Sequence, residues 1–319
     1  MKAKRIFLYV GLLFLSLTMF SLYSCKKSAS TDANETTAND NNLADNTSSD
    51  AQAVGDQAVA NAPSITKALI LSSSIGDSLK SQATTLSSSS GKDSVTITWV
   101  RGDTAGAGSI TIDFGTGFTC KDGRTRSGEI TVSWTGRYLA TGTRITYSSS
   151  NYTVNSNKIS FTKTVTNLGQ VYDSIYTTLL GNPLEFSVFD TLTLTKSGGG
   201  IVTWGAHRTR IMMWGWWNPF KFWNICYAIR GGGTGTTASG ASYTHKILAD
   251  LIKPVIIKQY IAGIYRISAP KETITIMAGQ TGKLVNWKTW YGITSIPELY
   301  ITEENNTTGA SISRIIPQE

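Results

Sequence analysis

The feature that most constrains the fold is a two-residue alternation of apolar and polar side chains, which begins near Val95 and recurs toward the C-terminus. In residues 129–138, Ile130, Val132 and Trp134 alternate with polar and charged residues. Successive side chains of a strand point to opposite faces of a sheet, so this pattern predicts a strand with one buried and one wet face. Similar alternation occurs in 95–99, 110–114, 145–147, 159–165, 186–194, 225–229, 264–267, 274–276, 284–290 and 299–301.

Turn-forming residues separate these runs. Gly, Asn, Asp and Ser are concentrated in 122–123, 155–157, 197–200, 231–233, 279–282 and 305–309. Parallel strands need long crossovers, usually helical, and no helix-length segment alternates with the runs. The spacing therefore predicts an all-β, antiparallel domain over 91–319. A two-layer sandwich and a long curled sheet both satisfy the pattern.

The N-terminus carries a different signal. Three basic residues precede an apolar run without charge over 6–20, and Ser24 then precedes Cys25. This order is typical of a secretory signal. A cysteine in that place is typical of a bacterial lipoprotein signal, so we interpret 1–24 as a signal peptide and Cys25 as an acylated anchor carrying palmitate-type chains. A single membrane-spanning helix is the alternative, although the run is shorter than the roughly 20 residues that a span needs.

The segment after the anchor is polar. Residues 28–62 are mainly Ser, Thr, Asn, Asp, Ala and Gln, with Leu43, Val54 and Val59 as the sizeable apolar side chains. Such a composition buries too little apolar surface to offset the entropy of ordering. We therefore expect a lipid-anchored, disordered linker over 25–62. Apolar residues near helical spacing in 64–80 predict a short helix or linker over 63–90.

The chain carries 29 Lys and Arg against 21 Asp and Glu, and the excess of basic residues lies in 63–319. A basic domain favours anionic surroundings such as lipid headgroups or acidic polysaccharide, although the charge also serves solubility. No basic run interleaves with aromatic residues, so no nucleic-acid partner is expected. Two histidines and no paired Cys or His spacing predict no metal and no cofactor. Cys120 and Cys226 are too few for a disulfide framework, and their redox state stays open.

Several short motifs occur between 95 and 290. They are ITIDFGTG at 110–117, KDGRTRSG at 121–128, WTGRY at 134–138, TVTNL at 164–168, RTR at 208–210 and TASG at 237–240. Together they resemble a group of β-strand-rich lipoproteins common in Bacteroidota, which carry the same kind of lipidation signal. The resemblance implies membership of that group and implies nothing about an activity or a ligand.

Candidate catalytic residues are few. Carboxylates in or beside strands are Glu129, Asp173, Glu185 and Asp190. A pair of them would suit glycoside hydrolysis, and each also fits an outward polar strand position. His207 and His245 are expected to be strand or loop residues, because no nucleophile-elbow sequence accompanies them. We expect that the protein is not an enzyme.

The segment 214–223 is dense in rings, with Trp214, Trp216, Trp217 and Trp223 around an Asn-Pro turn. Three interpretations compete for these residues. The rings would stack on sugars, enter a membrane interface, or fill one end of the β core.

Aspartate followed by Ser or Thr and an apolar residue occurs at 77–79, 93–95, 103–105, 173–175 and 190–192. This triplet matches the acceptor for protein O-glycosylation in Bacteroidota, although ordinary strand-edge composition gives the same letters. We predict glycans on Ser78 and Thr104.

Two functions are compatible with these features. The first is a non-catalytic, membrane-anchored lipoprotein of the cell envelope, whose β module binds a ligand such as a glycan or has a structural role. The second is a polysaccharide-acting hydrolase that uses strand carboxylates. The scarcity of histidine favours the first. Lys26, rather than an aspartate, follows the anchor, which favours the outer membrane and leaves open the side that the protein faces.

Overall fold

The computed structural model describes residues 32–60, 81–87, 94–102, 106–170, 183–214, 226–254, 262–270, 272–278, 299–309 and 311–316. These residues form one helix and fifteen strands. The chain separates into compact units of 1–36 and 37–319, and every contact described below lies within the second. Among the described helical residues, no stretch is long and apolar enough to cross a membrane.

The helix α2 (Asp32–Ala60) precedes a single antiparallel sheet. The strands are β1 (Ser81–Ser87), β2 (Ser94–Arg101), β3 (Gly108–Asp113), β4 (Phe118–Thr119), β5 (Thr125–Trp134), β6 (Arg144–Val154), β7 (Asn157–Gln170), β8 (Leu184–Thr195), β9 (Ile201–Trp214), β10 (Cys226–Thr236), β11 (Ser242–Pro254), β12 (Ala262–Ala269), β13 (Glu272–Ala278), β14 (Leu299–Asn305) and β15 (Ser311–Ile316).

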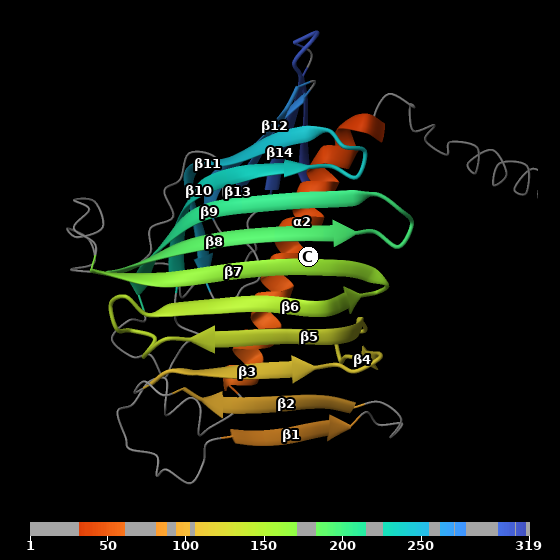
Figure 1. Ribbon diagram of the computed structural model, residues 1–319. Coiled ribbons are helices and arrows are strands. Elements are labelled where there is room, and N and C mark those ends of the chain that lie inside the picture. Colours follow the sequence, from red (N-terminus) through yellow and green to blue (C-terminus); the bar gives the residue numbers. More distant parts are fainter. Residues whose placement is uncertain are drawn as a thin grey trace, which may run out of the picture. The chain divides into compact units, whose positions relative to one another are not determined.

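Each strand pairs with the next one along the chain, except that short β4 pairs only with β5 and β3 also pairs with β5. The sheet is therefore a meander with β1 and β15 at its two ends, and it twists along its length (Figure 1). The predicted all-β, antiparallel class is confirmed. Of the two predicted architectures, a long curled sheet describes the molecule.

Local backbone geometry explains the tight connection between β6 and β7. Asn155 and Ser156 both have positive φ, 48° and 68°. A two-residue hairpin whose turn matches the strand twist needs positive φ at both central positions, and asparagine adopts that conformation readily. The turn predicted at 155–157 is confirmed.

The glycine run at 231–233 was expected to be a turn, and the structure instead places it inside β10. A Cβ on Gly233 would lie 1.8 Å from the carbonyl oxygen of Gly205, and one on Gly231 would lie 2.2 Å from that of His207. The register also shifts between Ile229 and Gly232. Glycine therefore serves here to allow close backbone approach at a bulge, which residue type alone does not distinguish from a turn.

One face of the sheet, which we call the inner face, is covered by α2 (Figure 1). It presents the apolar half of the alternation, including Ile110, Ile130, Leu194 and Trp204, all at most 4% exposed. A helix of 29 residues is about 43 Å long, close to nine strand spacings of about 4.8 Å. Its length is thus suited to crossing much of the sheet.

The prediction of a disordered linker over 25–62 is wrong for residues 32–60, which form α2. The buried positions of the helix recur every three or four residues and carry small or polar side chains. They are Thr37, Asp40, Asn41, Ala44, Ser48, Ala51, Gly55 and Ala58. A Cβ on Gly55 would lie 2.7 Å from Val132 of the sheet. Most large apolar groups of this interface come from the strands, and the helix adds only the half-buried Leu43, Val54 and Val59, so the helix sequence itself shows little apolar signal.

The prediction of a helix or linker over 63–90 is also wrong in part, because 81–87 form the edge strand β1. The helix expected over 64–80 lies outside the described residues. Cys120 and Cys226 are free cysteines. Cys226 belongs to a small apolar cluster with Ile211, Met213 and Ala228, and burial raises the pKa of its thiol to about 12.

Candidate ligand-binding face

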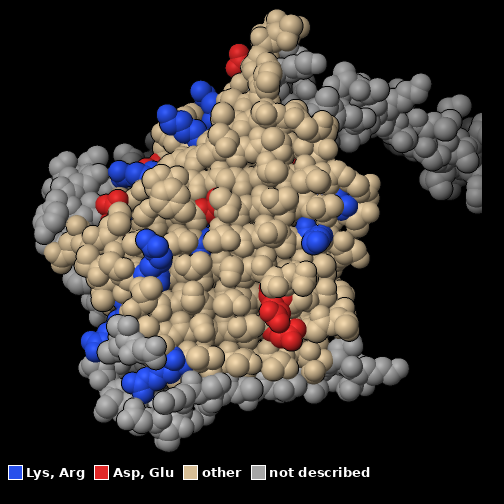
Figure 2. All heavy atoms as spheres, in the orientation of Figure 1, with Lys and Arg blue, Asp and Glu red and all other residues tan. Residues whose placement is uncertain are grey.

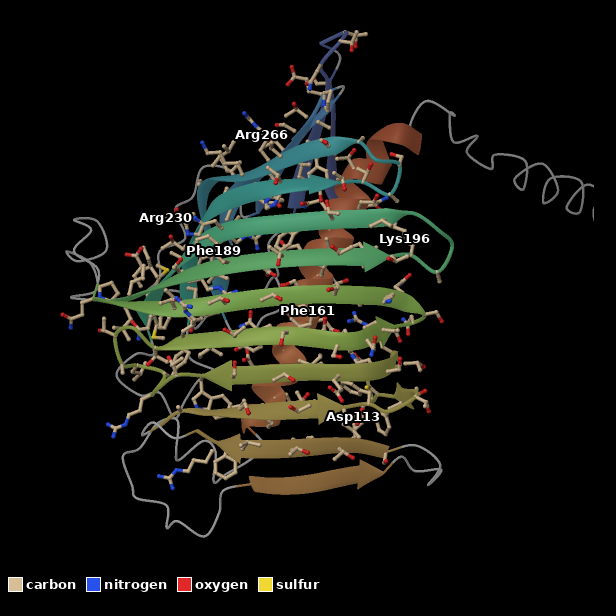
Figure 3. The ribbon with its side chains drawn as sticks, in the orientation of Figure 1. Asp113, Phe161, Phe189, Lys196, Arg230 and Arg266 are labelled. Carbon is tan, nitrogen blue, oxygen red and sulfur yellow. The ribbon has the colours of Figure 1, made fainter. Side chains whose placement is uncertain are left out.

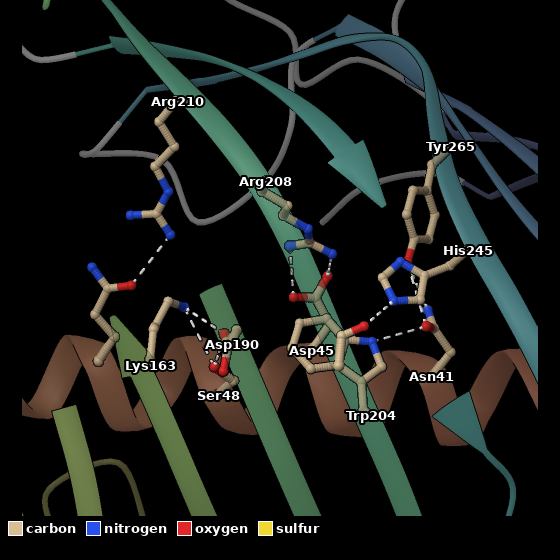
Figure 4. Close-up of polar contacts among 12 residues, drawn as sticks. Asn41, Asp45, Ser48, Lys163, Asp190, Trp204, Arg208, Arg210, His245 and Tyr265 are labelled. Atoms are coloured by element: carbon tan, nitrogen blue, oxygen red, sulfur yellow. Dashed lines mark hydrogen bonds and ion pairs between the residues drawn. The ribbon is translucent and has the colours of Figure 1, made fainter. Parts of the chain in front are cut away.

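The inner face is polar where it meets α2, and the helix supplies acids to basic residues of the sheet. Asp45 of α2 accepts two hydrogen bonds of 3.0 Å from Arg208 of β9 (Figure 4). Asp50 lies 2.7 Å from Arg126 of β5, whose side chain is 2% exposed. Asp40 forms an ion pair with Lys196. Carboxylate–guanidinium pairs with two parallel bonds fix orientation, so these contacts set how the helix lies on the sheet.

A buried ion pair lies under the middle of α2. Lys163 of β7 is 3.0 Å from Asp190 of β8, and both side chains are 4% exposed. Ser48 of the helix donates a hydrogen bond of 2.5 Å to the same carboxylate (Figure 4). Burial lowers the pKa of Lys163, and the Asp190 charge opposes that shift. Asp190, a candidate hydrolase carboxylate in the sequence, is therefore a structural partner of a lysine.

His245 is also part of the inner face. Its ring stacks on Trp204 at 5.3 Å and 5°, and its Nε2 lies 3.1 Å from the carbonyl oxygen of Gly205. Burial lowers its pKa to about 4, with the positive charge of Arg208 adding to the shift. The imidazole is therefore neutral near pH 7, with Nε2–H donating to that carbonyl. Trp204 in turn donates to Asn41 of α2 at 3.2 Å.

Near β4, Asp122 completes the charged interface. It accepts hydrogen bonds of 3.0 and 2.7 Å from Arg126, which hold the pKa of its carboxyl at about 2. Together, these ion pairs hold α2 on the inner face, and Arg210 of β9 adds a hydrogen bond of 3.3 Å to the amide oxygen of Gln52. A ligand would have to displace the helix to reach this face.

The opposite face of the sheet, the outer face, carries the polar half of the alternation. Its central feature, which we call the hydroxyl row, is a line of directly paired positions that crosses the sheet from β2 to β13. The row consists of Thr98, Thr111, Thr131, Ser148, Thr162, Thr191, Gly205, Thr234, Thr244, Ser268 and Thr273. Every member except Gly205 bears a hydroxyl group.

Part of this face is hollowed. A depression of about 930 Å³ lies over β7–β12 and includes the hydroxyl row from Thr162 to Ser268. A second row lies two residues further along the strands and borders the same hollow. This second row consists of Ser160, Thr193, Thr203, Thr236 and Ser242. The Thr203 and Thr236 hydroxyl oxygens are 2.7 Å apart, so neighbouring strands are linked through their side chains.

An aromatic pair stands beside the hollow. The rings of Phe189 on β8 and His207 on β9 stack at 4.0 Å and 11°, and Phe189 is 56% exposed (Figure 3). Ser187 approaches the Nε2 atom of His207 at 3.3 Å. Phe189 is two residues from Thr191 on β8, and His207 is two residues from Gly205 on β9. The two rings are therefore next to Gly205, the member of the hydroxyl row that has no hydroxyl group.

Figure 2 shows the middle of the outer face almost without charged residues. An acidic patch interrupts it toward β3 and β5, where Asp113 and Glu129 are directly paired. Asp113 also accepts a 2.7 Å hydrogen bond from the backbone N–H of Gly115. Among the described residues, no group of three or more His, Cys, Asp or Glu side chains is arranged to hold a metal ion.

The structure brings few of the sequence candidates together. Glu129 and His207 lie on the outer face, Glu185 is half-buried on β8, and Asp190 and His245 belong to the inner face. Trp214 ends β9, and its side chain is outside the described part of the chain. The candidates Cys25, Ser78, Thr104, Asp173, Trp216, Trp217 and Trp223 also lie outside the described residues.

The hydroxyl row was missed by sequence reasoning. Its signal in the sequence is the threonine-rich polar half of each alternating run, which the strand propensity of threonine explains equally well. Comparison with protein-family models, with curated proteins and with solved structures found no match for this chain.

Proposed function

We propose that this protein is a non-catalytic, lipid-anchored binding module of the cell envelope, held in the outer membrane by acylated Cys25, whose outer face binds a neutral glycan. The observation that carries the proposal is the hollow lined by two rows of Ser and Thr. Hydroxyl groups both donate and accept hydrogen bonds, as sugar hydroxyls do, so the two surfaces are complementary without charge.

Rigidity and apolar contact support this ligand class. Threonine is stiff at χ1, so a threonine row presents its hydroxyls with little loss of side-chain entropy on binding. Phe189 adds an exposed apolar ring beside the hydroxyls. A concave site with a few oriented polar groups and an apolar ring is the usual form of a small-ligand site.

Retention on insoluble neutral polysaccharides tests the binding proposal. We expect the full-length protein to be retained on at least one of them and Phe189→Ala to reduce retention. Leu168→Ala is the matched control, because Leu168 is similarly exposed at 51% but lies near the far end of β7. Absence of retention of the unaltered protein on every neutral polysaccharide would contradict the proposal.

Mass spectrometry of the membrane fraction tests the anchor. We expect a mature chain that begins at acylated Cys25, and a Cys25→Ala variant that is released from the membrane or keeps residues 1–24. An unmodified chain that retains 1–24 would contradict the lipid anchor. The same spectra would show the glycans proposed on Ser78 and Thr104.

A polysaccharide hydrolase is the second candidate, and the pairing of Asp113 with Glu129 favours it. Directly opposite residues have Cβ atoms about 4.5–5.5 Å apart, which is compatible with two carboxylates acting on one glycosidic bond. Release of reducing sugar that is lost in Glu129→Gln would establish this activity. Polysaccharide binding without any release would leave the non-catalytic module.

A further inference from the structure

The two rows on the outer face form a lattice with regular spacing, and the spacing narrows the class of glycan. Neighbouring strands lie about 4.8 Å apart, so the hydroxyls of one row repeat at about that interval. One pyranose residue of an extended β-linked chain has nearly the same length. A chain laid across the strands would therefore place one sugar over each strand.

The distance between the rows gives a second match. Residues two apart on one strand are separated by about 6.6–6.8 Å, so the hydroxyl row and the second row run parallel at about this distance. An extended β-linked pyranose chain is a flat ribbon with equatorial hydroxyls along both edges. Thr191 and Thr193 on β8, and Thr234 and Thr236 on β10, would then contact opposite edges of the ribbon.

Gly205 marks a position where the lattice is left open. A Cβ there would have its nearest neighbours at 3.7 and 4.0 Å, which is ordinary contact, and the backbone φ is not in the left-handed region. Packing therefore does not require glycine at this position, unlike at Gly233. Glycine within a strand weakens it, and one use of such a residue is close approach of a ligand.

The charges near the hollow favour a neutral chain. The basic residues Arg208 and Lys163 are on the inner face, where they bind Asp45 and Asp190. None of the described residues that line the hollow is acidic or basic. Lys246 and Arg266 are exposed on the outer face beside the hollow, two residues from Thr244 and Ser268. An acidic polysaccharide would meet cations at that border but only hydroxyls in the hollow itself.

We infer that the outer face binds a linear, neutral, β-linked polysaccharide that lies across β7–β12 along the hydroxyl row, with one sugar residue for each strand. The inference rests on the proposed glycan-binding function and specifies its ligand.

Titration of the full-length protein with cello-oligosaccharides of increasing length tests this inference. The affinity is expected to rise with each added sugar and to level off at about five or six residues, because the hollow spans six strands about 4.8 Å apart. Maltooligosaccharides of equal length have a curved chain and are expected to bind much more weakly. Cello-oligosaccharide affinity that stops rising at two or three residues, or equal affinity for the maltooligosaccharides, would overturn the inference.

Substitutions test where the polysaccharide chain lies on the outer face of the sheet. Thr191→Val and Thr234→Val remove a hydroxyl at constant shape, and each is expected to weaken cellohexaose binding about fivefold, the equivalent of one hydrogen bond. Gly205→Thr is expected to weaken it further by filling the open position. Thr131→Val, in the same row on β5 but outside the hollow, is the control and should leave affinity unchanged.

The outcomes separate the two proposals. Retention on a neutral polysaccharide with no dependence on cello-oligosaccharide length would preserve the proposed function and overturn the inference. Equal losses in Thr131→Val and Thr191→Val would also overturn it. Circular dichroism of each variant distinguishes loss of binding from loss of folding.

Discussion

At the scale of single residues, the inner face shows how polar groups are accommodated beneath a helix. The Lys163–Asp190 pair is nearly inaccessible to water, and Ser48 provides a further hydrogen bond from α2. A buried pair of this kind adds little net stability but is costly to break, because either partner alone is a buried, uncompensated charge.

We therefore predict that Asp190→Asn lowers the free energy of unfolding by about 3–5 kcal/mol. Urea denaturation at neutral pH would measure the change. Asp250→Asn is the control, because the Asp250–Arg230 pair is more exposed, and its loss should cost about 1 kcal/mol or less. A similar cost for both variants would contradict this account of the buried pair.

His245 makes stability depend on pH. Its pKa is lowered from 6.5 to about 4 in the folded protein, so the unfolded chain binds more protons between these values. Its contribution is thus complete above about pH 6.5 and is lost as the pH falls toward 4. Arg208 and Asp45 are the charged groups that influence the ring.

We expect the free energy of unfolding to decrease as the pH is lowered from 7 to 4.5. Urea denaturation at several pH values would measure this decrease. In His245→Gln, the part of this decrease that falls between pH 6.5 and 4.5 should become smaller. An unchanged pH profile in the variant would show that other groups cause the decrease.

At the scale of elements, α2 is a helix that depends on its partner. Its buried stripe consists of small or polar residues, and Ala44, Ala51 and Ala58 are its buried apolar side chains. Isolated helices with many Asn, Ser and Thr residues are marginal in water, and most helical stability in proteins comes from packing. Disorder is therefore the expected state of this segment in isolation.

A matched pair of substitutions tests how closely the buried stripe of α2 packs against the sheet. Ala44→Leu would insert a bulky side chain at a fully buried position and should destabilise the protein by about 1–3 kcal/mol. Ala53→Leu, at an exposed position of the same helix, should change stability by about 0.5 kcal/mol or less. Thermal unfolding would compare the two, and equal effects would show that the stripe does not contact the sheet tightly.

Alternation located β2, β3, β5–β8, β10 and β12–β14, because each of these strands carries its own apolar signal. It did not predict β1, β4, β9, β11 and β15, and the run predicted at 284–290 lies outside the described residues. The helix was missed because the apolar partners of Asn41, Ser48 and Gly55 lie on strands far along the chain. The hydroxyl row was missed because its alignment depends on register, which bulges such as the one between Ile229 and Gly232 adjust.

At the scale of the whole described domain, the inner face needs the helix. Arg126, Lys163 and Arg208 are buried basic residues that bind acids of α2 or of the sheet, and large side chains such as Trp204 lie among them. Without α2, this face would expose a broad apolar surface together with charges lacking the helix acids. An exposed patch of that size favours aggregation.

Deletion of residues 32–60 is therefore expected to abolish cooperative unfolding and to move the protein into the insoluble fraction. A synthetic peptide of 32–60, added during refolding, should restore a soluble and cooperative state. The matched peptide with Asp45→Asn and Asp50→Asn should restore it less well, because it lacks carboxylates for Arg208 and Arg126. A deletion variant that unfolds cooperatively by itself would contradict this dependence.

The simple neighbour-to-neighbour order of the sheet has a consequence for how such a chain can change during evolution. A hairpin duplicated within the meander would keep every other pairing and would lengthen the outer face by about two strand spacings. The helix would not grow with it, since its length is set by a separate segment of the gene. Relatives with wider sheets should accordingly carry compensating insertions in α2, in steps of about six or seven residues for each added hairpin.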